Sequence, residues 1–565
     1  MNPPQPLSRS VWFWTGLLIT AFKLWLTRAQ PVYAIGPAAH DDRLFLLLAE
    51  SLIRGEWLGA YTHMTLVKGP FYSMWVAALF ALGIPLGLGM QAAYAGACGL
   101  LARAFRPAIR SDVALLLIYL FLLWNPMSFE GPTLGRVIRQ QIYTPLELGI
   151  FAGLIALFAR RSQGWRRQLP WAALAGFCFG CFWLTREESV WIIPSVALLA
   201  GGAVFWAFRS LRGDGQRMLK SISVAVGCSL LPIGLVAFQN YREYHWFGAT
   251  EFRASEFKDA YGAMLRVKIG PELPYVPVTR QAREAMYAVS PTFALLQPYF
   301  EGEYGTGWAE ASFGMTKLPA EERQIGTGWL IWALRDSVAA AGYHHNAHGA
   351  LDFYRRMAAE INQACDDGRL PAHARRSGYL PIWKEGQSAE LLRTLWEFTD
   401  FVVSYKSFNA YPLPSIGTDD DVLLFRDLTN DRLTIVPAGT NFVLPNQAAL
   451  DVWKLAVLHE IGETQRPILC WVFILTQPIA LVCLVVALRR REPRFPLIVA
   501  AAAWGGSFAY LLVNAIVQIT SFSVVAVSTF WPIYPLLQLF TVAIIWDAVA
   551  IWHERRRSTA PAVSD

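Results

Sequence analysis

The chain has 565 residues, of which 54% are hydrophobic, 14% aromatic and 16% charged, and its formal net charge is +7. A soluble domain carries about 25% charged and 45–50% apolar residues. The composition therefore excludes a disordered chain, a fibrous repeat and a cysteine-stapled secreted module, and it indicates a polytopic membrane protein. The charged fraction is still too high for a chain made only of spans, which predicts a sizeable water-exposed part.

Apolar runs predict a mainly α fold, a transmembrane helical bundle of about ten spans, or eleven. A spanning helix needs roughly 20 mostly apolar residues. The long run 71–102 is expected to cross once with its first part, up to Pro85, bent or at the interface, and the span count stays open there. The ten runs are 11–26, 71–102, 113–124, 143–159, 171–184, 190–208, 222–238, 471–488, 495–517 and 530–551.

Positive charge predicts the orientation of the bundle. Five short connections, including one with Arg209, Arg212, Arg217 and Lys220, hold 18 Lys and Arg residues, against three on the short connections between them. Short loops rich in Lys and Arg face the cytoplasm, which places the polar segments 28–70 and 239–465 outside. The net charge then reflects orientation, so no nucleic-acid partner is predicted.

Three parts follow from this topology. Residues 1–238 form an N-terminal transmembrane module with a first outer loop, 28–70. Residues 239–465 form an extracytoplasmic, mostly helical domain, and residues 466–565 form a C-terminal region of three spans. Alternation around 421–436 allows a short strand or hairpin near Asn430.

The first outer loop carries the most informative pattern. Asp41 and Asp42 precede apolar residues at helical spacing, which predicts an amphipathic helix along the outer membrane face. One of the two acids could simply cap this helix, because a helix N-terminus favours carboxylates. Only one can cap, so the second acid suggests chemistry. One carboxylate could take a proton from an acceptor hydroxyl while its neighbour orients the acceptor or holds a divalent metal, Mg or Mn.

Basic residues on the same predicted face complete a candidate site. Each of them alone could equally be an interfacial anchor, but together they could clamp the phosphate of a lipid carrier. No Gly-rich phosphate loop is present, so the use of a nucleotide sugar is not supported. The candidates for binding the substrate or the lipid phosphate are His40, Lys68, Arg136, Arg139, Arg186, Glu187 and Arg242.

The pattern resembles the GT-C superfamily of integral-membrane glycosyltransferases, which take sugars from polyprenyl-phosphate carriers. The similarity covers roughly residues 10–250 and rests on Asp41, Asp42, Phe45, Ala49, Gly55, Pro70 and Tyr72. It implies a bacterial inner-membrane enzyme with its large domain on the periplasmic side, and membrane lipids and a polyprenyl-phosphate-linked sugar as partners. It also implies inversion at the anomeric carbon with Asp41 or Asp42 as base. The acceptor, whether glycan, lipid or protein, is not implied.

Two other functions stay open on the sequence alone. The chain could be a transporter or flippase of a lipid-linked or anionic solute, although its polar residues gather at one face and no two halves are related. It could also be a non-catalytic envelope assembly protein, in which case the Asp pair is dispensable. In the outer domain most aromatics are expected in the core, while some could stack on sugar rings; they are Tyr299, Trp308, Trp329, Trp332, Tyr343 and Tyr354.

Overall fold

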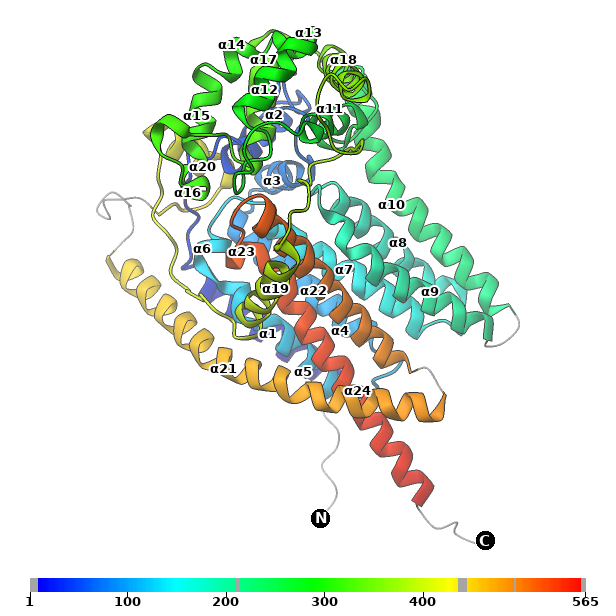
Figure 1. Cartoon of the computed structure of the whole chain (residues 1–565). Coiled ribbons are helices and arrows are strands. Elements are labelled where there is room, and N and C mark those ends of the chain that lie inside the picture. Colours follow the sequence, from blue (N-terminus) through cyan, green and yellow to red (C-terminus); the bar gives the residue numbers. More distant parts are fainter. Residues whose placement is uncertain (1–8, 210–212, 435–444, 492–493, 560–565) are drawn as a thin grey trace, which may run out of the picture.

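The protein is seen in a computed structural model that describes residues 9–209, 213–434, 445–491 and 494–559. Within these ranges the regular elements are helices, joined by a few isolated β-bridges. The predicted mainly α membrane fold is confirmed. A bundle of long helices carries a smaller group of helices at one end, which we call the cap (255–366), drawn in green at the top of Figure 1. Arg212, part of one predicted basic group, lies outside the described residues.

Most predicted apolar runs coincide with one bundle helix each, but the run 71–102 forms two helices, α3 and α4. Six of the described helices are long and apolar enough to cross a membrane, and a seventh span results if α3 and α4, bent by 110°, count as one. Two shorter apolar helices, α1 and α5, accompany them. The bundle helices are α1 (Arg9–Thr27), α3 (Phe71–Ala81), α4 (Leu86–Ala104), α5 (Asp112–Leu123), α7 (Gln140–Ala159), α8 (Trp165–Trp183), α9 (Ile193–Arg209), α10 (Asp214–Tyr244), α21 (Pro445–Arg490), α22 (Phe495–Thr520) and α24 (Ile533–Thr559).

Helix α7 lies at the centre of the bundle, packed against α4, α8 and α9. Nearly all of its apolar window is buried. Small residues allow this close packing: a side chain at Gly153 would meet the backbone of Trp171 and Ala175 on α8. Since helices in lipid associate largely through such close packing, α7 sets the positions of the connections at its ends, one of which carries Arg136 and Arg139.

The cap has its own apolar core, and part of the first outer loop belongs to it. Leu44, Leu48, Leu66 and Val67 from the loop are buried with residues of the cap. The predicted amphipathic helix therefore packs between bundle and cap, because its apolar face finds protein on both sides. The cap consists of α11 (Ser255–Arg266), α12 (Arg280–Val289), α13 (Pro291–Ala294), α14 (Gln297–Phe300), α15 (Glu303–Ala311), α16 (Phe313–Thr316), α17 (Thr327–Ala340) and α18 (Ala347–Asp366).

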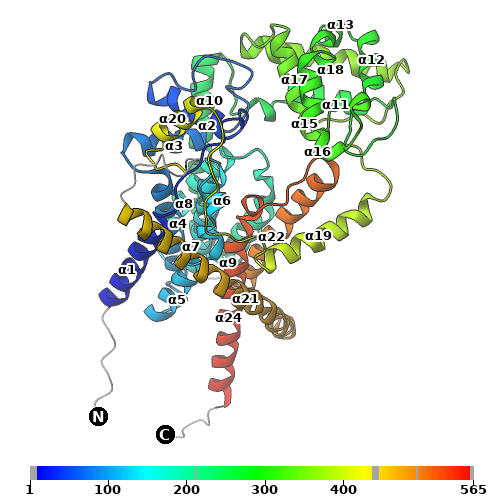
Figure 2. The same cartoon turned by 90° about the vertical axis from the view of Figure 1, so that its left-hand side faces the viewer.

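The rest of the predicted outer domain packs on the bundle. Helix α19 (Gln387–Val403) contacts α22, and α20 (Asp419–Thr429) contacts α3 and the first-loop helix. Figure 2 shows α19 running from the cap side down along the bundle. Helices α10 and α21 also run without interruption through the predicted limits at 238/239 and 465/466. Both predicted limits of the outer domain therefore fall inside continuous helices of the bundle.

The strand expected near Asn430 is wrong for the described residues. Residues 419–429 form α20, which begins with a capping box in which Thr418 and Asp421 satisfy each other's backbone N–H groups. Helix α20 ends at Asn430, whose φ of 49° lies in the left-handed region that Asn tolerates. The capping box stabilises the helix, although the alternating pattern of these residues favours a strand. Residues 435–444, where the predicted hairpin would end, lie outside the described residues.

A buried ion pair joins the cap to the first outer loop. Arg335 of α17 and Glu251 have side chains with no exposed surface and lie 2.7 Å apart. Arg335 Nε donates to the carbonyl of His63 at 3.0 Å, and Tyr61 donates to Glu251 at 2.5 Å. The backbone N–H of Glu251 donates to the carbonyl of Leu66 at 2.8 Å. The pair therefore holds the segment 61–66 against the cap.

Replacing Arg335 with Met should lower the thermal midpoint of the purified protein, because it leaves the Glu251 carboxylate buried without its cation. Removal of one partner of a buried pair costs about 3–5 kcal/mol. Thermal stability can be followed by size-exclusion chromatography of detergent-solubilised protein after heating. The matched control is Arg393→Met, since Arg393 pairs with Glu397 on an exposed helical face and should change the midpoint little. Equal midpoints for the two variants would contradict this role.

Candidate functional site

Two adjacent carboxylates lie where α2 (Asp42–Ile53) begins. Asp41 occupies the N-cap position, but its side chain makes no capping hydrogen bond. Asp42 lies in the first turn and is fully buried, whereas the Asp41 side chain is 49% exposed. The acid at the cap position therefore does not cap the helix through its side chain, and the two acids differ in their access to a substrate.

Arg136 holds Asp42 through both carboxylate oxygens. Its Nε donates to Oδ1 at 2.9 Å and to Oδ2 at 3.1 Å, and its Nη2 donates to Oδ2 at 2.8 Å. Arg136 is itself fixed, because Gln141 donates to its carbonyl at 2.6 Å and its backbone bridges to Tyr33. Burial raises the pKa of the Asp42 carboxyl, and the hydrogen bonds and charge of Arg136 oppose this rise. Asp42 thus positions the start of α2.

Asp41 forms an ion pair with Lys68, whose side chain is almost fully buried. Burial alone would raise the pKa of Asp41, but the positive charges of Lys68 and Arg139 outweigh it and lower the pKa below its usual value. Burial lowers the pKa of Lys68, while Asp41 opposes this effect. Lys68 also lies over the rings of Phe45, at 5.3 Å, and Trp332, at 5.6 Å. At neutral pH Asp41 is an accessible, ionised carboxylate beside a buried cation.

Glu187 connects the Lys68 segment to Arg139. Its Oε1 accepts a hydrogen bond from the backbone of Gly69 at 2.9 Å, and its Oε2 accepts one from Arg139 at 2.6 Å. Gly69 also packs directly on the carbonyl of Leu184, and any side chain there would overlap that oxygen. The four charged residues Asp41, Lys68, Arg139 and Glu187 are called the loop cluster below.

Arg186 lies beside the loop cluster and is held by other partners. Its Nε donates to Glu188 at 2.7 Å, and its guanidinium lies 5.5 Å from the ring of Tyr143. Burial would lower the pKa of Arg186, but Glu188 and nearby tyrosines raise it above its usual value. Arg253 donates to the carbonyls of Arg186 at 2.7 Å and Glu187 at 3.1 Å. Arg186 and Arg253 therefore add two cations at the edge of the site.

His40 lies against the cap, between two tryptophan rings. Its ring centroid is 5.1 Å from that of Trp308 and 4.4 Å from that of Trp332. Burial lowers the pKa of His40, although Asp336, which accepts from Trp308 at 2.7 Å, opposes the change. His40 is therefore neutral at pH 7 and can offer one donor and one acceptor. The cap covers this side of the loop cluster.

The structure brings together all predicted site residues except one. Arg242 lies in the last turn of α10, where its side chain is two-thirds exposed and approaches Glu243 at 3.6 Å. It has no contact with the loop cluster. The expectation missed Arg253 and Glu188, and it listed Trp308 and Trp332 only among many aromatics. Arg253 and the two tryptophans contact the site across large distances in sequence, which no local spacing indicates. Glu188 instead directly follows the predicted Arg186 and Glu187.

The Asp pair does not present two free carboxylates to a divalent cation. Arg136 occupies both oxygens of Asp42, and Lys68 contacts Asp41. In the part of the chain that the structure describes, no group of three or more His, Cys, Asp and Glu side chains could hold a metal ion. The arrangement does not fit a metal bridging the pair.

In the comparisons with known proteins, one solved structure is similar to the chain. No protein-family model and no curated protein matches the chain. Over 98% of this chain and 81% of the other, the fold is similar to that of ArnT from Cupriavidus metallidurans in the apo state, with 11% sequence identity and a TM-score of 0.30. At this TM-score the similarity carries no conclusion about the family or the residue roles of this chain.

Asp42→Asn is expected to lower the thermal midpoint of the purified protein more than Asp41→Asn does. The first change removes the charge that Arg136 binds through both oxygens, at a cost on the order of 3 kcal/mol. The second leaves the buried Lys68 without its carboxylate, but position 41 is half-exposed, so water can replace part of the lost interaction. The same heating assay measures both variants. A larger loss of stability in Asp41→Asn than in Asp42→Asn would overturn the assignment of their roles.

Proposed function

We propose that the protein is a membrane glycosyltransferase that moves a sugar from a polyprenyl-phosphate-linked donor to an acceptor at the face of the bundle that carries the cap. The observation that supports it most directly is the accessible, ionised Asp41 next to the buried cation Lys68. The loop cluster lies on connections at the ends of bundle helices, where the head group of a lipid-linked donor would be. We further propose that this face is periplasmic in a bacterial inner membrane.

In the proposed reaction Asp41 is the general base. It takes the proton of an acceptor hydroxyl while the acceptor oxygen bonds to the anomeric carbon. The bond from that carbon to the phosphate oxygen breaks on the opposite side, with inversion, and polyprenyl phosphate leaves with the electron pair. A carboxylate of low pKa suffices, because the acceptor oxygen becomes acidic as its new bond forms.

The cations of the site would stabilise the leaving phosphate. Lys68 and Arg139 are held at the loop cluster by Asp41 and Glu187, so they are in place before the donor binds. Preorganised positive groups stabilise developing negative charge without reorganisation cost at the moment of reaction. Arg186 and Arg253, at the edge of the cluster, would extend this positive surface toward the carrier phosphate.

Asp41→Asn should reduce transfer by at least about 100-fold, the contribution expected of a general base. The variant is expressed in cells that lack their own copy of the protein, and surface glycans and lipid-linked intermediates are compared by mass spectrometry. We expect the donor to accumulate and the modified glycan to disappear. Arg242→Gln is the control, since Arg242 lies outside the site. Normal glycans with normal amounts of the Asp41→Asn protein would refute the enzyme proposal.

Lys68→Met is expected to move the acidic limb of the pH–rate profile to higher pH. The Lys68 charge lowers the pKa of Asp41, so its removal raises this pKa and protonates the base at a higher pH than in the wild type. The rate of polyprenyl phosphate release is measured in isolated membranes from about pH 4 to 8. The position of the limb is compared, because the absolute rate also falls when a cation is lost. An unshifted limb would exclude Asp41 as the base.

One observation favours the transporter alternative. Glu147 lies within α7, fully buried, and neither of its carboxylate oxygens has a hydrogen-bond partner. Buried ionisable groups inside membrane helices often belong to a solute or proton pathway. The membrane assay separates the two functions, because a transporter moves the lipid-linked substrate without releasing polyprenyl phosphate.

A further inference from the structure

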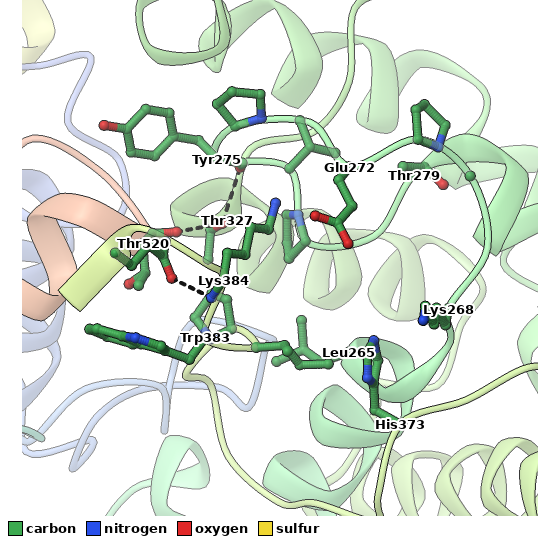
Figure 3. Close-up of a pocket in the computed structure, with 18 of the residues that line it drawn as sticks. Leu265, Lys268, Glu272, Tyr275, Thr279, Thr327, His373, Trp383, Lys384 and Thr520 are labelled. Carbon is green, nitrogen blue, oxygen red and sulfur yellow. Dashed lines mark hydrogen bonds between the residues drawn. The ribbon is translucent and has the colours of Figure 1, made fainter. Parts of the chain in front are cut away.

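A second pocket, large enough to hold a ligand, lies away from the loop cluster. It forms where three parts of the chain that are distant in sequence meet. The pocket has a volume of about 690 Å³, within the range of pockets that bind small ligands. Its walls come from the cap segment 265–279, from the segment 381–390 that leads into α19, and from Ile519 and Thr520 at the end of α22. Figure 3 shows these segments around Lys384. The pocket therefore lies at the junction of cap and bundle.

The side chains in this pocket combine aromatic surface with charges of both signs. Tyr275 and Trp383 lie on either side of Lys384 in Figure 3. Trp383 is 40% exposed, so its ring is open to a ligand. Lys268 and Lys384 are offset by Glu272, Glu385 and Glu390. Such a lining does not favour a polyanion, a polycation or a lipid tail. It suits a ligand with apolar faces and many hydroxyl groups, which is the chemistry of a carbohydrate.

The backbone of the pocket is restrained, and part of it has no N–H to donate. Four of the lining residues are prolines, which have no N–H to donate and have a fixed φ. Tyr275 has a φ of 58°, uncommon for a residue with a side chain. Thr327 holds this conformation, because its backbone N–H and its Oγ1 donate to the Tyr275 carbonyl at 2.9 and 3.1 Å. A preorganised pocket of this kind loses little entropy when it binds a ligand.

One helix connects this pocket to the loop cluster. Thr327, the first residue of α17, lines the pocket, and its one hydroxyl proton is shared between the carbonyls of Tyr275 and Thr520, each 3.1 Å from Oγ1. Trp332, five residues further on, contacts His40 and Lys68. At a rise of 1.5 Å per residue the two positions are about 8 Å apart along the helix axis. They project from different sides of α17, about 140° apart around its axis, so this one helix carries a wall of the pocket on one side and a contact of the loop cluster on another.

We infer that this pocket binds a neutral carbohydrate chain and holds part of the acceptor glycan. The binding of carbohydrate stands on the pocket alone, whereas its role as acceptor site rests on the proposed function. The acceptor is then a glycan, and the cap contributes its binding site separately from the loop cluster. Prolines and Tyr275 supply the fixed surface, and Trp383 supplies the aromatic contact.

The test is direct binding of oligosaccharides to the full-length protein in detergent. The probes are cellotetraose, maltotetraose, mannotetraose and chitotetraose, each measured by saturation-transfer difference NMR. We expect saturation transfer from the protein to at least one of the four oligosaccharides. Trp383→Ala should weaken that binding about tenfold or more, in line with the loss of a buried aromatic contact. Trp396→Ala is the matched control, because Trp396 is an exposed tryptophan of α19 outside the pocket and should leave binding unchanged.

Each outcome decides the inference. Absence of saturation transfer to all four oligosaccharides overturns the inference. Oligosaccharide binding that Trp383→Ala leaves unchanged overturns it as well. Inorganic phosphate is a fifth probe, followed by broadening of its ³¹P signal because it has no C–H protons. Binding of phosphate without any oligosaccharide would also overturn the inference. Asp41→Asn separates this inference from the proposed function. If the variant binds oligosaccharide normally and still transfers sugar, the enzyme proposal fails and the pocket stands. If it loses transfer while the wild type binds no oligosaccharide, only the pocket inference fails.

Discussion

The buried contact between Asp42 and Arg136 is the interaction on which the site depends. It joins the first turn of α2 to the connection that precedes α7, the most buried helix of the bundle. Because Arg136 takes both oxygens of Asp42, the neighbouring Asp41 turns toward Lys68 and water. Two acids adjacent in sequence thereby acquire different tasks. One anchors a helix on the rigid bundle, and the other is free to meet a substrate.

The cap extends this arrangement by covering the loop cluster from the opposite side. The Arg335–Glu251 pair and the shared apolar core hold the first outer loop on the cap, while Trp308 and Trp332 contact His40. The loop is thus fixed from two directions, which suits preorganised electrostatics. A site built only on a flexible loop would have to spend binding energy to order its charges. Here the packing of bundle and cap does so during folding.

Much of the fold and part of the site could be predicted from the sequence. Apolar runs identified every bundle helix, since helices buried in lipid must satisfy their own backbone groups. The Asp pair stood out because only one of two adjacent acids can cap a helix, and Lys68 and Arg139 stood out because they lie on the same predicted face as the pair. The difference between Asp41 and Asp42 could not be foreseen, because it depends on Arg136, far along the chain.

Arg242 was misplaced since α10 continues past it and turns its side chain outward. The capping box before α20 was a readable signal that the alternating pattern obscured.

Helix α21 has a consequence for how the protein responds to its lipid environment. With 46 residues it is about 69 Å long, more than twice the thickness of a hydrocarbon core of about 30 Å. It runs obliquely across the bundle in both views (Figures 1 and 2). Near its start, Lys454 lies 4.2 Å from the Trp25 ring of α1. Because a helix much longer than the hydrocarbon core must tilt, this contact between α21 and α1 is one point where the packing of the bundle restrains that tilt.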